Sequence, residues 1–566
     1  MWARNFLFIL LCLAGLGMIA SSLLDRNRID TPNTFTGGQA RLVSTSPPMK
    51  SDSASEEWPQ ITSRINAEFE KHWQAQGLSH AEKANEFAIV RRLSLALTGT
   101  IPSVEEIRAL ERVKPEDRVE WWVAHLLEDR RFADYVAERL ARAYVGTEDG
   151  PFILYRRRRF VTWLADHLHR NERYDKIVTE LIADTGLWNA SPAVNFVTVT
   201  AQQNKGNKPD EIRLAGRTTR AFLGMRIDCL QCHDDKLAKV TIMEDGQPRG
   251  GTQQDFHHLA AFFGETQMQL TGVRDDPKLK YKYKYLHADT EEVVPPKVPY
   301  GQELFDGKGT RREQLARWVT NPKNKPFARA TVNRIWALMF GKPLVNPVDD
   351  IPLEGPFPPG METLAEDFIV HGYDLERLIR IIAASEVYQL DSGAEFEITP
   401  AHEEHWAVYP VTRLRPEQVA GSVVQSSSLP TINAQSHVFS QLGKFISTSQ
   451  FVQRYGDLGE DEFIDRGGTI PQRLLMMNGE LVKERSDNNP VQNASTRISM
   501  VTSDNEKAVE TAYLATLTRR PSPQELAHFI TRLNERFPEK DPSSRSQKME
   551  DMYWVLLNST EFSWNH

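Results

Sequence analysis

The sequence predicts a mainly α-helical protein with two helical domains and a small β-containing insertion between them, preceded by an apolar N-terminal segment and a flexible linker. Apolar residues recur at helical spacing over most of the chain after residue 59. Lys and Tyr alternate from Lys280 to Tyr285, which is the period of a β-strand. An uncharged apolar run from Phe6 to Leu24 is followed by a stretch rich in Ser, Thr, Pro and Gly.

Length and composition are those of a globular protein with several domains. The chain has 566 residues, of which 40% are hydrophobic and 25% charged, so a sizeable core can form. The net charge of -8 argues against a general nucleic-acid-binding protein, because no basic excess exists to neutralise phosphates. We expect these segments: an export segment at 1–24, a linker at 25–58, a first helical domain at 59–264, a β-containing crossing at 265–308 and a second helical domain at 309–566.

The N-terminal segment predicts export from the cytoplasm. Arg4 precedes the apolar run of residues 6–24, which is long for a signal peptide and just long enough to span a bilayer. Ala20 and Ser22 suit cleavage after Ser22, whereas Leu23 and Leu24 prolong the run. A cleaved signal peptide and an anchor in the inner membrane both remain open, and either places the protein in the periplasm or cell envelope.

Helices of the first domain are predicted from apolar spacing and from their ends. One helix ends at Thr98-Gly99, and Ser103 to Glu106 form a capping box that begins the next. A long loop is expected from Leu187 to Pro209 and a Gly-rich loop from Gly246 to Gly251. The further helical patterns of this domain are Trp121 to Leu127, Phe132 to Tyr144, Phe160 to Leu168, Tyr174 to Ile182, Asp210 to Phe222 and Asp255 to Phe263.

The second domain is predicted to be helical from about Arg311 onward. Ser522 to Glu525 repeat the Ser-x-x-Glu capping pattern near its end. The helical patterns here are Phe327 to Phe340, Met361 to His371, Leu375 to Val387, Pro416 to Ser426, Pro471 to Val482, Glu506 to Leu517 and Lys548 to Leu557.

The pattern Cys229-Leu230-Gln231-Cys232-His233 predicts a c-type haem attachment site. In C-x-x-C-H, two thiols add to the vinyl groups of haem and the following imidazole binds the iron. Cys229 and Cys232 are the cysteines that attach haem c, and His233 is the proximal iron ligand. Export supports this prediction, because c-type haem is attached outside the cytoplasm. His257 or His258 is a candidate distal ligand, although packing is the expected role of His257.

Other chemistries fit parts of the same sequence. The cysteine pair can close a disulfide in an oxidising compartment, or bind zinc with His233 and a fourth ligand. Asp349 and Asp350 form a carboxylate pair on a turn, for which a solvated or capping role is expected. Arg334 can pair with either of them and tie its helix to the following loop. No phosphate-binding loop, nucleophile elbow or H-E-x-x-H helix is present, so no hydrolase motif occurs.

Several stretches together resemble a family of secreted planctomycete-type bacterial proteins with two paired domains of unknown function, numbered fifteen forty-nine and fifteen fifty-three. The first domain, commonly labelled cytochrome-like, is similar to Arg91 to Gly99, Cys229 to Asp234 and Ala260 to Phe263. The second is similar to Asn333 to Trp336, Phe340-Gly341, Val348 to Asp350, Ser385 to Tyr388 and Leu414 to Gln418. This chain has Asp235 where the family usually continues Cys-His-Asp-His, and Gly360-Met361 where a His-Pro pair is usual.

The resemblance implies an exported, mainly helical protein that is often encoded beside a sulfatase-like partner, and it implies no particular reaction. Together with the motif, it predicts an exported or membrane-anchored haem protein that transfers electrons to a redox partner. The alternative is a non-redox extracytoplasmic binding or scaffold protein, with carbohydrate-related partners and a C-x-x-C disulfide or metal site. Neither alternative involves nucleic acid.

Overall fold

The computed structural model describes residues 58–147, 155–201, 208–236, 240–244, 247–269, 271–286, 288–305, 307–432, 451–456, 463, 468–487, 489, 493–535 and 545–566. All of them lie in one compact unit, residues 45–566. The predicted export segment and all of the linker except Trp58 lie outside the described residues. Among the helices that are described, none is both long and apolar enough to cross a membrane.

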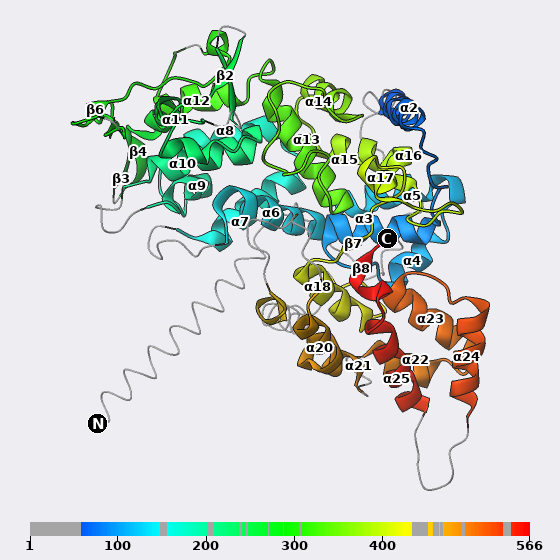
Figure 1. The fold of residues 1–566 in the computed structure, drawn as a ribbon. Helices are drawn as coiled ribbons and strands as arrows, with labels where there is room; N and C mark the ends of the chain where they lie inside the picture. The colour runs from blue at the N-terminus through cyan, green and yellow to red at the C-terminus, as the bar shows by residue number, and fades with distance from the viewer. Residues whose placement is uncertain are drawn as a thin grey trace, which may run out of the picture. The chain divides into compact units, whose positions relative to one another are not determined.

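The protein is mainly helical, as predicted, and its strands are short (Figure 1). Each of the four sheets in the described part of the chain is a two-stranded antiparallel pair. The first helices are α2 (Trp58–Gln76), α3 (Glu86–Thr98), α4 (Val104–Leu110), η2 (Pro115–Asp117), α5 (Arg118–Glu128), α6 (Arg130–Val145), α7 (Arg157–His169) and α8 (Tyr174–Ala183).

Local sequence sets the ends of these helices. Gly99 adopts a left-handed conformation with φ of 69° and ends α3, which a residue with a Cβ atom does at a steric cost. The Ser103 side chain accepts a hydrogen bond from the backbone N–H of Glu106, and the Glu106 carboxylate accepts one from the N–H of Ser103. This capping box begins α4, so both predicted boundaries are confirmed.

The region between residues 187 and 305 contains more regular structure than the sequence predicts. The predicted loop from Leu187 to Pro209 contains two short helices, and residues 247–250 of the predicted Gly-rich loop form strand β2. The elements are η3 (Pro192–Val194), α9 (Asn195–Thr198), α10 (Glu211–Thr218), the π-helical turn η5 (Thr219–Leu223), η6 (Asp228–Gln231), β1 (Thr241–Glu244), β2 (Gln247–Gly250), α11 (Gln253–Ala260) and η7 (Ala261–Phe263). The predicted crossing holds β3 (Thr266–Gln269), β4 (Gly272–Asp275), β5 (Lys282–Tyr283), β6 (Glu292–Val293) and η8 (Gln302–Leu304).

Two predicted helices of the second half are interrupted. The helix expected from Leu375 to Val387 breaks at Ser385, and that expected from Pro471 to Val482 breaks at Gly479, because both residues adopt extended ψ angles near 145°. The elements are α12 (Arg311–Val319), α13 (Lys325–Phe340), α14 (Met361–Val370), α15 (Leu375–Ala384), α16 (Glu386–Gln389), α17 (Pro400–Glu404), β7 (Thr412–Arg413), α18 (Pro416–Ser426), α20 (Ile470–Asn478), α21 (Glu480–Ser486), α22 (Ala494–Val501), α23 (Asn505–Leu517), α24 (Pro523–Asn534), α25 (Arg545–Leu557), η9 (Glu561–Ser563) and β8 (Trp564–Asn565).

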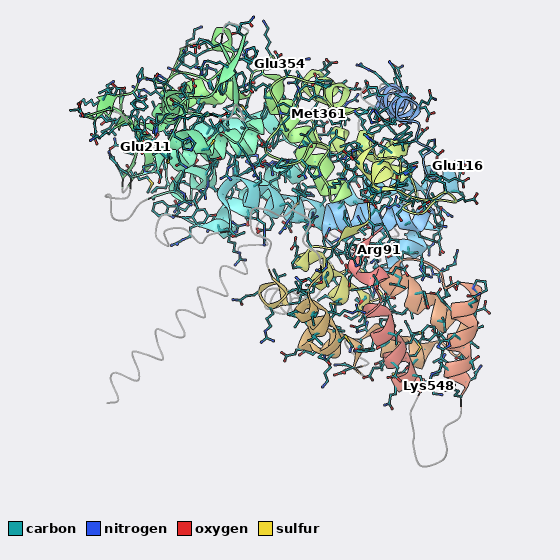
Figure 2. The ribbon with its side chains drawn as sticks, viewed as in Figure 1. Arg91, Glu116, Glu211, Glu354, Met361 and Lys548 are labelled. Carbon is teal, nitrogen blue, oxygen red and sulfur yellow. The ribbon has the colours of Figure 1, made fainter. Side chains whose placement is uncertain are left out.

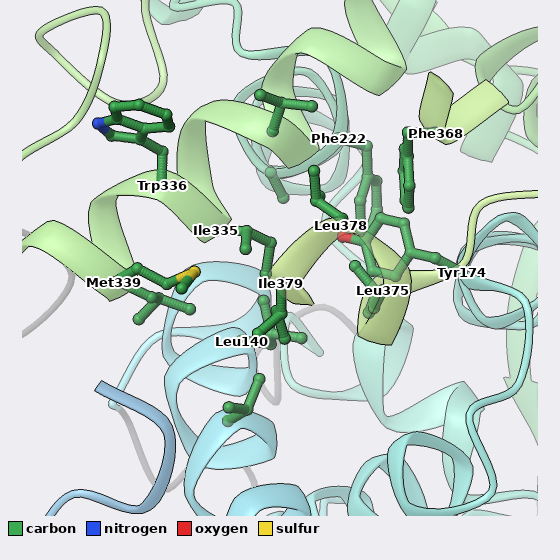
Figure 3. Packing of buried hydrophobic residues seen from close by; sticks show 14 of the residues in the cluster. Leu140, Tyr174, Phe222, Ile335, Trp336, Met339, Phe368, Leu375, Leu378 and Ile379 are labelled. Atoms are coloured by element: carbon green, nitrogen blue, oxygen red, sulfur yellow. The ribbon is translucent and has the colours of Figure 1, made fainter. Parts of the chain in front are cut away.

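Buried apolar residues form two clusters. The larger contains residues from Ile65 of α2 to Tyr409, together with Leu514 of α23, and therefore includes helices on both sides of the predicted crossing. Helices α6, α13 and α15 contribute Leu140, Ile335 and Ile379 to it, which Figure 3 shows together with Phe222 of η5. The smaller cluster joins α18 to α25 with Leu95 and Ile101 from the early part of the chain. The boundaries proposed at 264 and 309 remain a prediction.

Helix α3 binds the end of the chain through two buried arginines. Arg91 donates hydrogen bonds to the carbonyl oxygens of Thr516 (3.3 Å) and Phe562 (3.1 Å), and Figure 2 shows where it lies. Arg92 donates to the carbonyl oxygens of Leu390 (2.7 Å) and His566 (2.8 Å). Burial lowers the pKa of Arg91 to about 10, because a low-dielectric surrounding disfavours the charged form.

Another buried arginine, Arg312, joins α12 to the first half of the chain. The guanidinium of Arg312 forms two bonds of 2.8 and 2.9 Å with the carboxylate of Asp275, at the end of β4. It also donates to the carbonyl oxygens of Ile182 (3.1 Å) and Asp184 (2.8 Å), which lie two positions apart at the end of α8. The Arg312 side chain is 0% exposed and that of Asp275 is 5% exposed. Removing one partner therefore leaves a charge buried without its counterion.

We expect Arg312→Ala to lower the free energy of unfolding by about 3–5 kcal/mol, because Asp275 is then buried as an unpaired carboxylate. Urea unfolding followed by circular dichroism measures the change. Arg532→Ala is the matched control: its side chain is 50% exposed and pairs with Glu535 within one helical turn, so we expect a loss below about 1 kcal/mol. Equal losses in the two variants would contradict the prediction.

Candidate haem-attachment site

The C-x-x-C-H motif lies on a short turn at the end of a helical segment. Helix α10 begins at Asp210, whose carboxylate accepts hydrogen bonds from the N–H groups of Ile212 and Arg213. The chain continues through η5 and Gly224 into the 3-10 turn η6, which carries Cys229. A Cβ atom at Gly216 of α10 would lie 2.5 Å from Oδ1 of Asp228. Glycine at this position therefore allows the turn to pack directly on α10.

The two cysteines are exposed free thiols. Leu230 between them is 0% exposed, and a Cβ atom added at Gly251 would lie 2.6 Å from its Cδ1 atom. One side of the turn is thus packed while both thiols face outward. The pKa of the Cys229 thiol is raised, first by burial and then by the carboxylate of Asp235, so the protonated thiol is favoured.

His233 is exposed, and its ring orientation is set by its own backbone neighbourhood. Its Nδ1 atom lies 2.9 Å from the carbonyl oxygen of Asp234. Because a carbonyl oxygen only accepts hydrogen bonds, Nδ1 carries the proton and Nε2 keeps its lone pair. Metal-binding histidines commonly have this arrangement, in which one ring nitrogen donates to a carbonyl and the other binds the metal.

The carbonyl oxygen of Gln231 is the point at which the turn is bound to the rest of the protein. It accepts hydrogen bonds from Nε2 of Gln253 (3.1 Å), Nε2 of His257 (3.0 Å) and the hydroxyl of Tyr283 (3.2 Å). Gln253 and His257 belong to α11 and Tyr283 to β5. Three donors from two elements therefore fix the backbone between the two cysteines.

Both ring nitrogens of His257, a predicted distal ligand, are used inside the protein. Nε2 donates to Gln231, so Nδ1 accepts from the hydroxyl of Tyr281 at 2.8 Å. The imidazole is 0% exposed and stacks on the ring of Tyr283 with centroids 3.4 Å apart. Burial and the nearby His258 lower its pKa to about 4, because both disfavour the imidazolium. In this arrangement His257 supports the turn through both ring nitrogens, and its assignment as a distal ligand stays a prediction.

His258, the other predicted distal ligand, lies on a different side of α11. It is half-buried, and its Nδ1 atom donates to the carbonyl oxygen of Pro295 at 2.7 Å. Its assignment as a distal ligand stays a prediction. In the described part of the chain, no three or more His, Cys, Asp or Glu side chains are grouped so that they could hold a metal ion.

The two aspartates after His233 have structural partners. Oδ1 of Asp234 accepts from the backbone N–H of Gln253 (2.8 Å), the first residue of α11, where a negative charge is favoured. Oδ2 of Asp235 accepts from the N–H of Val240 (2.5 Å). Asp235 therefore connects the end of the motif to the backbone of Val240.

Comparison with known proteins identifies the family to which the chain belongs. Residues 64–268 match the family model described as Protein of unknown function (DUF1549), and residues 311–450 match that described as Protein of unknown function (DUF1553). The chain belongs to the family that carries these two domains in this order. The resemblance inferred from the sequence is thus confirmed. No curated protein and no solved structure matches the chain.

The carboxylate pair of the DUF1553 domain has a different partner from the one predicted. Asp349 forms an ion pair with Arg226 of the DUF1549 domain, with 2.7 Å between Oδ1 and Nε. Arg334 forms no ion pair with Asp349 or Asp350 in the described structure. Arg226 lies closer because Ile351 binds the turn before it, donating its N–H to the carbonyl oxygen of Gly224 at 2.7 Å.

Sequence reasoning missed the residues that support the motif turn. Gln253, Tyr281 and Tyr283 lie 20 to 50 positions after it and match no ligand motif. The alternation of Lys and Tyr was a usable signal, because residues two apart in an extended chain share one face. Tyr281, Tyr283 and Tyr285 all lie around His257, at centroid distances of 6.1, 3.4 and 5.7 Å.

The lowered pKa of His257 predicts a loss of stability in acid. The unfolded chain binds this proton near the ordinary value of 6.5, whereas the folded protein binds it near 4. The contribution is therefore complete above pH 6.5 and falls as the pH drops from 6.5 toward 4. We expect His257→Gln to remove this part of the pH dependence of urea unfolding, while the exposed His169→Gln control keeps it. An unchanged pH dependence in His257→Gln would show that the histidine is not held neutral.

Proposed function

We propose that this protein is an exported c-type haem protein that transfers electrons, with haem attached through Cys229 and Cys232 and with His233 as the proximal iron ligand. The observation that carries the proposal is the combination of two exposed thiols on one turn with an exposed imidazole whose Nδ1 is occupied and whose Nε2 lone pair is available. That donor set is the one that thioether attachment and axial ligation require.

Residues beside the turn support the proposal, although Cys229, Cys232 and His233 are not among those that line the neighbouring cavity. A cavity of about 230 Å³ adjoins η6 and is lined by Asp228 and Gln231 of the turn, by Phe256 and Ile212, and by Arg213, Arg217 and Arg220. The apolar members suit a porphyrin edge, and guanidinium groups suit the propionate carboxylates. A c-type haem bound here would supply a one-electron redox couple.

The protein's own residues would position the haem and set the orientation and basicity of its proximal ligand, His233. The three hydrogen bonds to the Gln231 carbonyl hold the spacing of the two thiols constant. The bond from Nδ1 of His233 to Asp234 holds the ring orientation and makes Nε2 more basic. Because Asp234 also binds the start of α11, the ligand is connected to a buried helix rather than to a mobile loop.

We also propose that the protein acts outside the cytoplasm, held to the inner membrane by residues 6–24 or released after cleavage. Its proposed partners are a redox protein and the sulfatase-like protein that the family resemblance implies. Cell fractionation tests the location: we expect the protein in the periplasmic or membrane fraction. Finding it with cytoplasmic markers would contradict both export and covalent haem attachment.

The alternative function is a non-redox extracytoplasmic binding or scaffold protein with a local disulfide or a metal site. Two free, exposed thiols three positions apart in the sequence are compatible with it. Haem attachment is the preferred proposal because His233 follows Cys232 directly and keeps the lone pair of its Nε2 atom available, as axial ligation of a c-type haem requires.

The proposal predicts covalent haem in the mature protein. Expression with a cytochrome c maturation system is expected to give a haem-stained band that survives denaturation, and a sharp α-band on reduction. Cys229→Ser/Cys232→Ser is expected to lose the stain. Titration of thiols in the unfolded wild type distinguishes the alternative, since two thiols that appear only after reductant indicate a disulfide. Wild type without haem in this system would rule out the proposal.

The His233→Ala variant tests the proximal ligand independently of the covalent attachment of haem. The thioether bonds can still form, so we expect the haem stain to persist, whereas loss of the strong axial ligand converts the spectrum toward a high-spin form. His169→Ala, an exposed histidine at the end of α7, is the matched control and should leave the spectrum unchanged. A low-spin wild-type spectrum in His233→Ala would show that another residue is the proximal ligand.

A further inference from the structure

A small cavity between the DUF1549 and DUF1553 domains is lined mainly by arginines. Its volume is about 50 Å³, which is room for a few water molecules or one small anion. Arg217 of α10, Arg220 of η5, Arg226 and Arg334 of α13 line it, with Asp349 as the lining carboxylate among the described residues. Arg217 and Arg220 also line the larger cavity beside η6, so the two cavities are neighbours.

Arg334 is the residue that points to a ligand. It is 8% exposed, and its Nε atom is buried without a hydrogen-bond partner. All residues of α13 from Phe327 to Phe340 are buried and most of them are apolar, so water does not surround this part of the helix. A buried guanidinium is stable only when its charge and its donors are matched. The described residues supply no such match to Arg334.

The other arginines of the cavity have partners of their own. The Nε atom of Arg226 lies 2.7 Å from Oδ1 of Asp349, and the Nε atom of Arg220 lies 3.5 Å from Oδ2 of Asp228. Their guanidinium groups raise the positive potential around Arg334, which favours a negative group beside it. Guanidinium groups bind oxyanions through paired N–H donors, and they occur where phosphate, sulfate or carboxylate groups are recognised.

We propose that this cavity is a binding site for a small oxyanion, a phosphate or sulfate group taken from solution, with Arg334 as its buried donor. The site would therefore take a free inorganic anion or the anionic end of a larger molecule. Arg226, held by Asp349, and Arg220, at the border of the two cavities, complete the donor set. The inference does not depend on haem, since none of these residues belongs to the attachment motif.

Thermal unfolding and calorimetric titration with sodium phosphate and sodium sulfate, at constant ionic strength set by chloride, test the proposal. We expect a saturable rise in Tm for the wild-type chain and a measurable heat of binding. Arg334→Gln is expected to weaken binding by about tenfold or more, because a charged donor is lost from a buried site. Cys229→Ser/Cys232→Ser, which cannot attach haem, is expected to bind as the wild type does.

Two further variants keep the test decisive. Arg220→Gln changes a side chain that is 33% exposed, so it reports on binding even if Arg334→Gln fails to fold. Arg173→Gln is the matched control, because this arginine is 62% exposed and pairs with Asp175 away from the cavity. Equal affinity in wild type, Arg334→Gln and Arg220→Gln would overturn the proposal.

Two carboxylate residues of the chain are close in sequence to a residue that lines the cavity. Phe463, which lines it, directly follows Asp461 and Glu462 in the sequence. The double variant Asp461→Asn/Glu462→Gln removes these two carboxylates, so its phosphate binding can be compared with that of the wild type. Phosphate binding by the wild type supports the proposal, whereas binding by this double variant alone would show that the cavity is filled by the chain itself and would overturn it.

Discussion

The hydrogen bonds from two buried arginines of α3 to carbonyl groups far along the chain are the interaction on which the rest of the structure depends. Arg91 and Arg92 are 2% and 0% exposed, and their acceptors lie between residues 388 and 566. Arg92 also lies 3.6 Å from the ring centre of Tyr409. A guanidinium removed from water needs such acceptors to stay charged, so these residues require the C-terminal segment to pack against α3.

That requirement explains how a helix from the first family domain belongs to both hydrophobic clusters. Leu93 and Leu97 of α3 pack in the larger cluster, whereas Leu95 packs in the smaller one with helices α18 to α25. Arg312 makes a comparable connection between α12, β4 and α8. The DUF1549 and DUF1553 domains are thus connected by buried polar bonds as well as by apolar packing, which fixes which surfaces can meet.

The motif turn is likewise fixed by hydrogen bonds from residues distant in the sequence. A single carbonyl group, that of Gln231, collects three donors, and the buried Leu230 fills the space beside Gly251. The backbone between the cysteines is therefore rigid, while the two thiols and the imidazole of His233 stay exposed. Reactive side chains on a rigid, well-supported backbone are what a covalent cofactor site needs, because the spacing of the thiols must match the two vinyl groups.

The sequence by itself determined the features that depend on neighbouring residues. The end of α3 at Gly99, the capping boxes at Ser103 and Ser522, the helical character of the chain and the C-x-x-C-H pattern are all local, because a cap or a motif needs only a few consecutive residues. Helix α18 has the predicted bounds, Pro416–Ser426. The family could also be inferred, since its motifs are short and ordered along the chain.

Tertiary structure alone decided which distant groups meet. His257 supports the motif turn together with Tyr281 and Tyr283, which lie 24 and 26 positions later in the chain. No local rule predicts that the two hydroxyls reach one imidazole and one carbonyl. Asp349 pairs with Arg226 rather than Arg334 because Ile351 and Gly224 bring their loops together. The hairpin β1–β2 forms where glycines predict a loop, since strand pairing depends on the partner strand. These outcomes depend on long-range packing and desolvation, which local residue patterns do not encode.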